Sequence, residues 1–415
     1  MEITIHRGSK EIGGTCIEIT SEKGKKILVD AGSPLDDSNP DTSYIENEVD
    51  AILISHPHQD HYGLLEGYNG GAKIYIGEVA LDFINAAKLF IGKQLLEGDF
   101  TKIKAYQTIE IEDNFKVTPY LTDHSTPESF AFLIEADGKK VYYSGDFRAT
   151  GRKKNLFENT LKRPPKDIDV LLMEGTMIER EQHKYPTEES VEKAMYEIAR
   201  NQKNISCVVS SAQNIDRLIS IVRVCRRLNK QLVIDPYTAW LLDALKKQSK
   251  NVPTMDWDEI AVYLNPSHMN KIDNELHAKF IERLTINSVG SKVFSEPSKY
   301  IYFERNPNQK FHEPLLKFGP INIVYSQWEG YLKEEFKQYF TENINELKNH
   351  PSYQFYSIHT SGHAVVKDLL SFAKAINSKL VYPIHTAYPK RFKDIFEKNG
   401  FSNVSVLQDG VNIRI

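Results

Sequence analysis

Residues 50–63, DAILISHPHQDHYG, are the most informative stretch of the sequence. The stretch begins with an apolar run, DAILIS, of the kind that forms a buried strand. Three histidines and an aspartate follow where that strand would end: His56, His58, Asp60 and His61. Such residues have little use in a core unless they are paired, but imidazole nitrogen and carboxylate oxygen both bind zinc. Because side chains alternate along an extended loop, two of the four can face one ion and two can face a second.

Three more candidate ligands stand at the ends of other apolar strands. His124 ends VTPYLTDHS, Asp146 ends KKVYYSGD and His385 ends KLVYPIH. Each alone would more often be structural, but the three share one chain with the HxHxDH motif. A carboxylate such as that of Asp146 can bridge two ions that lie ~3.5–4 Å apart. The sequence therefore predicts two divalent ions, one held by His56, His58, His124 and Asp146 and the other by Asp60, His61, Asp146 and His385.

Length and composition are those of a soluble globular chain. It has 415 residues, which suits two or three domains, with 40% hydrophobic and 26% charged residues. No apolar run approaches the ~18 residues of a membrane span, and the N-terminus has no apolar signal segment. The three cysteines lie far apart, so we expect a reducing, cytoplasmic setting and no membrane partner. The net charge of −4 gives no general sign of nucleic-acid binding, so any polyanion has to be held by a local feature.

Two kinds of organisation follow one another along the chain. Residues 1–173 consist mainly of short β-type runs, with one helical pattern near 79–93, which predicts packed sheets with helices outside. After Glu174, strands and helices alternate, which is typical of a parallel α/β unit. We expect Thr187 to cap the first of these helices.

Several segments carry no functional signal of their own. Residues 249–320 are interpreted as irregular. The Lys/Arg-rich residues 152–166 are interpreted as a solvated loop. The histidines outside the strand ends are treated as surface or local residues: His6, His183, His268, His277, His312 and His350.

A second group of polar residues lies beyond the predicted ligands. Glu174 ends the apolar run DVLLME, where an unpaired carboxylate would be costly. His363 follows Ser361-Gly362 at another strand end and leads into a predicted helix. A glycine-containing turn before a helix offers N–H groups to a phosphate oxygen. Each signal is weak alone, because surface acids and short Ser-Gly-His sequences are common.

Together these motifs resemble the metallo-β-lactamase fold, an αββα sandwich with a two-metal site at one edge, and within it the β-CASP nucleases. Residues 56–63 (HPHQDHYG), 174–176 (EGT), 359–364 (HTSGHA) and 383–386 (PIHT) carry the resemblance. The opening HRGSKEIGGTCIEI is similar to the ribonuclease J branch of that family. We expect the chain to lack that branch's C-terminal domain, since the sequence stops at Ile415. Thr386-Ala387 also stands where Gly-Glu is usual.

The resemblance implies a division of this α/β chain into two domains. The metallo-β-lactamase sandwich would comprise residues 1–177 and 357–415. An inserted α/β β-CASP domain would comprise residues 178–356.

The resemblance also implies an activity. The chain would be a ribonuclease that cuts single-stranded RNA, as an endonuclease or from the 5′ end, with two zinc or manganese ions. His385 favours RNA, because DNA-directed members of the family commonly lack this histidine. Asp60 would be a ligand and accept the proton of the attacking water, while His363 would act as general acid and Glu174 would orient it. The predicted RNA contacts are Ser211, His359, Ser361 and Gly362, with Tyr237 or Trp240 stacking on bases.

Other functions stay open at the level of sequence. They are a DNA nuclease of the same family, a small-molecule ester or lactone hydrolase on the same fold, and a non-catalytic nucleic-acid-binding subunit. The size of the insertion and the HTSGH sequence argue against the small-molecule hydrolase. The full set of predicted ligands argues against the non-catalytic subunit. The sequence does not decide the oligomeric state.

Overall fold

The computed structural model describes residues 1–35, 42–46, 48–180, 184–273, 275–333 and 343–415. The chain divides into two compact units. Unit 1 comprises Met1–Ile84, Leu96–Gln182 and Gly362–Ile415, and unit 2 comprises Asn85–Leu95 and His183–Ser361. Residues 85–95 thus belong to unit 2, whereas the sequence placed them in the first domain.

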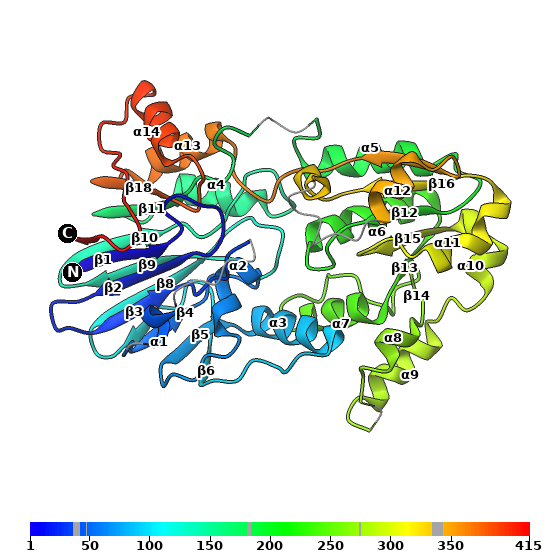
Figure 1. Cartoon of the computed structure of the whole chain (residues 1–415), viewed down its shortest axis with the longest axis horizontal. Coiled ribbons are helices and arrows are strands. Elements are labelled where there is room, and N and C mark those ends of the chain that lie inside the picture. The colour runs from blue at the N-terminus through cyan, green and yellow to red at the C-terminus, as the bar shows by residue number, and fades with distance from the viewer. Residues whose placement is uncertain (36–41, 47, 181–183, 274, 334–342) are drawn as a thin grey trace. The chain divides into compact units, whose positions relative to one another are not determined.

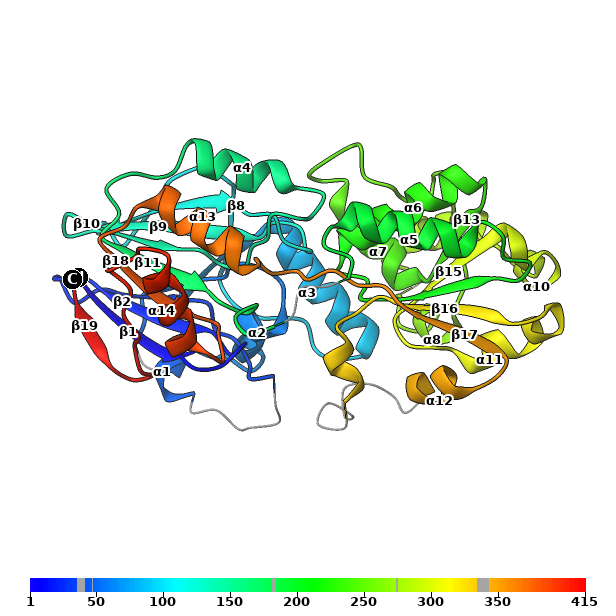
Figure 2. The same cartoon turned by 90° about the horizontal axis from the view of Figure 1, so that it is seen from above.

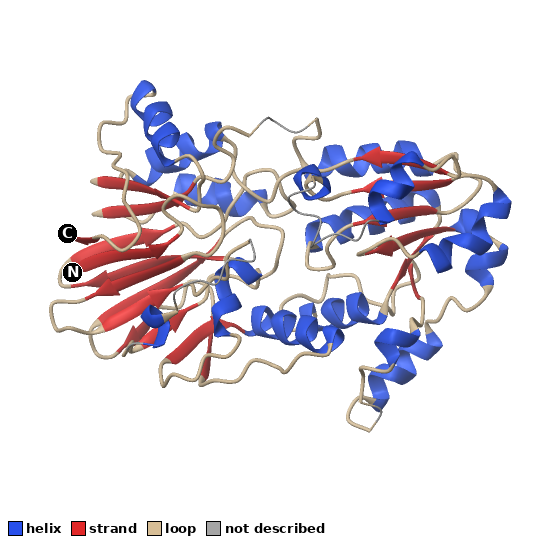
Figure 3. Ribbon diagram, viewed as in Figure 1, coloured by secondary structure: helices blue, strands red, loops and turns tan. Residues whose placement is uncertain are grey.

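Unit 1 contains two β-sheets (Figure 3). The first has the order β19-β1-β2-β3-β4-β5-β6, and the second has the order β18-β11-β10-β9-β8-β7. The strands of the first sheet are β1 (Glu2–Arg7), β2 (Cys16–Thr20), β3 (Lys26–Val29), β4 (Ala51–Leu53), β5 (Lys73–Gly77), β6 (Phe100–Ile103) and β19 (Asn412–Arg414). Those of the second are β7 (Ile109–Ile111), β8 (Phe115–Leu121), β9 (Phe130–Ala136), β10 (Lys139–Tyr143), β11 (Val170–Glu174) and β18 (Leu380–Ile384).

Helices cover the outer faces of both sheets. They are α1 (Ser43–Glu46), α2 (Gln59–Tyr62), the 3₁₀ helix η1 (Gly63–Leu65), α3 (Glu78–Ile91), α4 (Lys154–Lys162), α13 (Val366–Ile376) and α14 (Pro389–Lys398). Only the first half of α3, up to Ile84, belongs to unit 1. Side-chain alternation along the strands explains the layers: in β3, Ile27 and Val29 pack between the sheets, while Leu28 packs outward among the helices. Figure 2 shows α4 and α13 over the second sheet, where Phe157 and Phe372 pack in one cluster. The αββα sandwich is therefore confirmed.

Unit 2 is built on a parallel sheet of order β14-β13-β15-β12-β16-β17 (Figure 1). Its strands are β12 (Ser206–Val209), β13 (Gln231–Ile234), β14 (Ile260–Val262), β15 (Tyr300–Glu304), β16 (Ile321–Tyr325) and β17 (Tyr353–Ser357). Its helices are α5 (Glu188–Ala199), α6 (Ile215–Leu228), α7 (Pro236–Leu245), α8 (Pro266–Met269), α9 (Ala278–Ile286), α10 (Lys292–Ser295), α11 (Gln309–His312) and α12 (Asn343–Asn349), with the 3₁₀ helices η2 (Pro297–Lys299), η3 (Glu313–Phe318) and η4 (Glu329–Leu332). The parallel α/β prediction is confirmed, since all these strands pair in parallel. In the described part of the chain no helix is long and apolar enough to cross a membrane.

Two local predictions are wrong. Residues 249–320 are not irregular: they contain β14, β15 and α8 to α11. β15 is a fully buried central strand, so its sequence, YIYFE, has no polar alternation to mark it. The basic segment 152–166 contains helix α4, which buries Phe157 and leaves its charged residues outside.

The helix cap predicted at Thr187 is confirmed. The Thr187 hydroxyl accepts the Ser190 N–H at 3.1 Å, and the Ser190 hydroxyl in turn accepts the Thr187 N–H. Glu188, the next residue, is buried and accepts two hydrogen bonds from Arg217 of α6, at 3.0 and 3.1 Å. Arg217 also donates to the Ser326 carbonyl oxygen at 2.7 Å, and it has no exposed surface. A buried ion pair therefore ties α5 and α6 to the end of β16.

We expect Arg217→Met to lower the free energy of unfolding of unit 2 by ~3–5 kcal/mol, because it leaves the carboxylate of Glu188 buried without its cation. Urea unfolding followed by tryptophan fluorescence reports on this unit, since Trp240, Trp257 and Trp328 all lie in it. The control is Arg200→Met, since the Arg200–Glu197 pair in this unit is half exposed and should contribute below ~1 kcal/mol. Equal losses in the two variants would show that the buried pair is not stabilising.

Candidate metal centre

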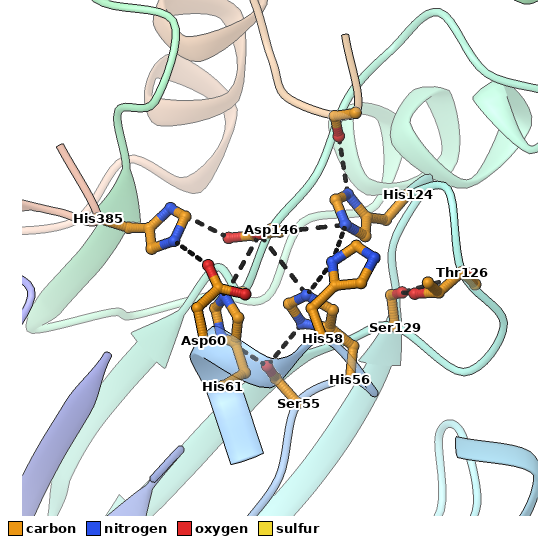
Figure 4. A network of polar contacts seen from close by, with 12 residues as sticks. Ser55, His56, His58, Asp60, His61, His124, Thr126, Ser129, Asp146 and His385 are labelled. Carbon is orange, nitrogen blue, oxygen red and sulfur yellow. Dashed lines mark hydrogen bonds and ion pairs between the residues drawn. The ribbon is translucent and has the colours of Figure 1, made fainter. Parts of the chain in front are cut away.

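The seven predicted ligands come together in unit 1. They follow β4, β8, β10 and β18, whose ends meet at one edge of the sandwich, and Figure 4 shows their side chains gathered around Asp146. One ligand atom each from His56, His58, His124 and Asp146 lies within 4.8 Å of all the others. Asp60, His61 and His385 form a second group of this kind. Asp146 reaches both groups, since its carboxylate also lies 3.4 Å from His61 Nε2 and 3.6 Å from His385 Nδ1.

Hydrogen bonds outside the cluster fix how two of these rings face inward. His124 donates through Nδ1 to the carbonyl oxygen of Gly362 at 2.7 Å. Because a carbonyl only accepts, Nε2 of His124 carries a lone pair and points to the cluster. His61 donates through Nδ1 to the carboxylate of Asp30 at 2.7 Å, which directs its Nε2 inward in the same way.

The atoms that point into the cluster are better placed to coordinate a divalent cation than to hydrogen-bond with one another. Nδ1 of His58 lies 3.0 Å from Nε2 of His56 and 3.2 Å from Nε2 of His124, so three imidazole nitrogens converge on one point. Two further buried atoms, Nε2 of His61 and Oδ1 of Asp146, have no hydrogen-bond partner among the residues that the structure describes. Orphaned atoms of this kind are costly in a protein interior unless an ion satisfies them. Nitrogen and carboxylate donors together suit zinc or manganese.

For five of the seven predicted ligands, the electrostatics favour the forms that metals bind. Burial, together with neighbouring imidazoles, holds the pKa of His56 and His124 well below the usual range, and burial lowers the pKa of His58 to about 4. Burial opposes the charge of Asp146 and Asp60, but the imidazoles around them outweigh it and lower the pKa of both carboxyls. Neutral imidazole and ionised carboxylate are the forms that coordinate a cation. His61 differs: burial opposes its charge, but the carboxylates of Asp146, Asp30 and Asp60 outweigh burial and raise its pKa.

Asp30 is a residue of the candidate site that the sequence analysis missed. It is fully buried, and its carboxylate accepts hydrogen bonds from His61, from the Ser55 hydroxyl at 2.8 Å and from the Tyr143 hydroxyl at 2.5 Å. It follows the apolar strand β3 just as the predicted ligands follow theirs, so the strand-end rule could have found it. Gly32 is required beside it, because a Cβ there would lie 1.7 Å from the Asp60 carbonyl oxygen.

We expect Asp30→Asn to weaken metal affinity by ~10- to 100-fold, because partners behind a ligating histidine orient it and raise its basicity. Asn tolerates the left-handed backbone at this position, where φ is 61°, so the fold should persist. Competition with a chelator measures the affinity. The control is Asp167→Asn, an exposed aspartate of the same unit that also has positive φ. Equal affinities in the two variants would contradict the orienting role of Asp30.

Glu174 and His363 lie beside the metal cluster. Nδ1 of His363 is 3.3 Å from Glu174 and 3.7 Å from the carboxylate of Asp146. Glu174 is almost fully buried and accepts N–H groups of Thr176 at 3.0 Å and Ala364 at 3.3 Å. Burial opposes the charge of His363, but the carboxylates of Glu174 and Asp146 outweigh it and raise its pKa. One side of His363 remains partly exposed, at 20% of its side chain.

The last predicted ligand, His385, sits in a constrained position. Its backbone has φ 49°, which is uncommon for a residue with a side chain, and its N–H donates to the Gly8 carbonyl oxygen at 2.6 Å. The Thr176 hydroxyl lies 2.9 Å from its Nδ1, and Nε2 lies 3.2 Å from the carboxylate of Asp60. Such strained positions persist where surrounding contacts determine them, and they cluster at functional sites.

The predicted RNA contacts divide between the two units. Gly362, in unit 1, uses its carbonyl to orient His124. Ser211, His359 and Ser361 belong to unit 2, and their contact with RNA stays a prediction. Ser211 is exposed on the loop after β12. The prediction that a base stacks on Tyr237 is wrong, because the side chain of Tyr237 is buried and only 3% exposed.

Comparison with known proteins points to one group of relatives. Residues 25–209 match the model of the β-lactamase superfamily domain. The chain is similar to the RNase J-like protein of Methanocaldococcus jannaschii, with 29% identity over 42% of each chain. It is similar to ribonuclease J of Mycoplasma pneumoniae, with 22% identity over 93% of this chain and 67% of that protein. It also matches RNase aCSPSF2 of Saccharolobus solfataricus, with 28% identity over 46% of this chain and 41% of that protein. The chain thus spans less than half of each archaeal relative.

A solved structure extends the comparison to the whole chain. It is a protein of unknown function from Enterococcus faecalis V583, with a TM-score of 0.77 and coverage of 99% of both chains. The sequences are 18% identical, so this likeness shows the fold alone.

Proposed function

We propose that the chain is a metal-dependent ribonuclease of the β-CASP family, because it carries a metallo-β-lactamase domain and has ribonuclease J and RNase aCSPSF2 as homologues. Its reaction would be the hydrolysis of RNA phosphodiester bonds. The observation that carries the proposal is the ligand cluster, in which two groups of histidine and aspartate atoms share Asp146 beside the Glu174–His363 pair.

The residues around the cluster support a division of labour. Two bound divalent ions would supply Lewis acidity and neutralise the charge of the phosphate. Asp60, at the rim of the cluster with 15% of its side chain exposed, would accept the proton of the attacking water. His363 would protonate the leaving 3′-oxygen from Nε2, because Nδ1 faces Glu174. Glu174, fixed by its own backbone hydrogen bonds, would hold the ring and keep it charged.

The substrate we propose is single-stranded RNA, held in part by Ser211, His359 and Ser361 of unit 2. The names of the relatives support RNA as the substrate, rather than an ester or a lactone. Zinc is the proposed metal and manganese the alternative, since the nitrogen-rich donor set accepts both. We also propose a cytoplasmic location, which suits the buried free thiols of Cys16, Cys207 and Cys225.

Incubation of the purified, metal-loaded protein with end-labelled substrates tests the proposal. We expect cleavage of RNA that carries a 5′-monophosphate or a 5′-triphosphate, and none of a lactone or thioester. DNA of the same sequence should be cut more slowly than RNA. Hydrolysis of DNA alone would assign a DNA nuclease, and turnover of the esters without RNA cleavage would assign a small-molecule hydrolase. The product lengths would also separate internal cutting from cutting at the 5′ end.

A further inference from the structure

Unit 2 contains a polar cavity that the cleavage chemistry does not use. Its volume is about 430 Å³, within the range of sites for small ligands and cofactors. Asp235, His268, Glu304 and Arg305 line it, together with amides that include Asn306. Asp235 directly follows β13, His268 lies in α8 after β14, and Glu304 and Arg305 are the last residue of β15 and the one after it. The cavity therefore opens at the carboxyl edge of the parallel sheet.

The position of the cavity in the sheet is one where ligands bind. β13 and β15 are parallel neighbours in the sheet of unit 2 (Figure 1). After β13 the chain crosses through α7 to β14 on one side, and after β15 it crosses through α11 and η3 to β16 on the other side. Where two adjacent strands send their connections in opposite directions, a crevice forms between the loops, and it is the usual ligand site of open α/β sheets. Asp235 follows one strand of this pair, and Arg305 follows the other.

The side chain of Arg305 is held in place on the cavity wall. Its guanidinium carbon lies 4.6 Å from the centre of the buried Tyr237 ring, which is cation–π geometry. Nη2 of Arg305 also donates to Nε2 of His268 at 3.2 Å. A guanidinium cannot accept, so Nε2 of His268 carries the lone pair and the ring proton is on Nδ1, which faces Asp235 at 3.4 Å. His268 is only 7% exposed, so the alternative that it is a surface residue is wrong.

The charges around the cavity restrict what it can take. Lys310 and Arg305 are cations, but Asp235 and Glu304 line the same space, so a bare anion gains little there. Both carboxylates are already engaged: Glu304 accepts from His312 and from the Asn308 N–H at 3.0 Å, and Asp235 accepts the Thr238 N–H at 2.7 Å. The cavity therefore suits a largely neutral, flat group that offers hydrogen bonds, with a charge at one end.

We propose that this cavity binds one ribonucleotide, with its base stacked on the guanidinium plane of Arg305 and its edge facing the carboxylate and amide groups. Arginine planes and aromatic rings are common platforms for unpaired bases. A third of the Arg305 side chain stays exposed, and Tyr237 supports it from within. The phosphate of the nucleotide lies toward Lys310, the exposed cation of the wall. The inference rests on the proposed ribonuclease function, and the nucleotide comes either from the substrate strand or from the free pool.

Calorimetry of the metal-loaded protein with AMP, GMP, CMP and UMP tests the proposal. We expect at least one of them to bind, and Arg305→Gln to weaken that binding by ~5- to 150-fold, the usual worth of one stacked base. Arg305→Lys should lose the same amount of nucleotide affinity, because lysine keeps the positive charge but lacks the planar guanidinium group. The control is Arg226→Gln: Arg226 also lies over an aromatic ring of unit 2, that of Trp257, but outside the cavity. It should bind nucleotides like the unchanged protein.

Two further measurements identify the ligand and its source. If the nucleotide belongs to the substrate strand, Arg305→Gln raises the KM for RNA and leaves kcat unchanged. If it is a free nucleotide, KM stays the same and nucleotide binding alone is lost. Both results support the site.

Three results of the nucleotide and KM measurements overturn the nucleotide site. They are equal nucleotide affinity in Arg305→Gln and the unchanged protein, retention of nucleotide affinity in Arg305→Lys, and absence of nucleotide binding together with an unchanged KM. The cavity would be an anion site instead if inorganic phosphate bound as tightly as the nucleotides and Arg305→Gln abolished phosphate binding. That result would also overturn the proposal. Failure of the unchanged protein to cut any RNA would refute the proposed function but not this site, because nucleotide binding is measured without cleavage. Thermal unfolding of each variant checks that it is folded.

Discussion

Asp146→Asn should abolish RNA cleavage and remove metal. Asp146 reaches both ligand groups, and its carboxylate lies within 4.0 Å of His56, His61 and His124. An asparagine keeps the shape of the aspartate side chain but lacks the negative charge that balances two dications. The variant should bind one ion or none and lose at least ~10³-fold in rate, since metal ions supply several kcal/mol to such reactions.

Metal analysis after gentle purification and metal re-addition measures the first effect, and cleavage of labelled RNA measures the second. Asp167→Asn, exposed in the same unit, is the matched control and should retain both ions and full activity. If Asp146→Asn kept two ions and slowed cleavage less than about tenfold, the prediction that Asp146 bridges the two ions would be wrong.

His363→Ala should keep both ions while it slows RNA cleavage by ~10²–10⁴-fold, the usual worth of a positioned acid. His363 also lies in ligand range of Asp146 and His385, so metal content separates the two roles that its position allows. The effect should depend on the leaving group. A nitrophenyl phosphodiester releases a phenolate that needs no proton, so the variant should lose far less activity on it than on RNA.

His6→Ala is the control for the removal of an imidazole, because His6 belongs to unit 1 and lies against Tyr44 and Glu18. It should leave the rates on both substrates unchanged. Loss of an ion in His363→Ala, or equal slowing of RNA and nitrophenyl substrate, would reassign His363 as a metal ligand or a phosphate-binding residue.

The strand-end rule explains why so much of the site could be predicted. Strands that run together in one sheet present their ends at one edge, so polar residues after apolar runs, such as His124 and His385, meet there whatever their separation in sequence. Alternation between buried and polar positions likewise predicts the two sheets of unit 1. Both signals are local, and local signals survive in a single sequence.

What the sequence could not provide depends on contacts between distant segments. The role of Asp30 comes from His61 and Tyr143 together, and that of the Gly362 carbonyl comes from His124. β15 was missed because a strand that is buried on both faces has no polar alternation. His268 and His312 were misjudged for a related reason: burial of a histidine depends on the loops that close over it.

The chain order of unit 1 also determines when the protein can become active during its synthesis. β18 pairs with β11 only after the whole of unit 2 has been made, and β19 completes the other sheet beside β1. The strands of unit 2, by contrast, are contiguous in the chain, so this unit can fold first. Until His385 emerges from the ribosome, the ligand cluster lacks a member. We therefore expect the nascent chain to acquire the proposed ribonuclease activity only after His385 has left the ribosome.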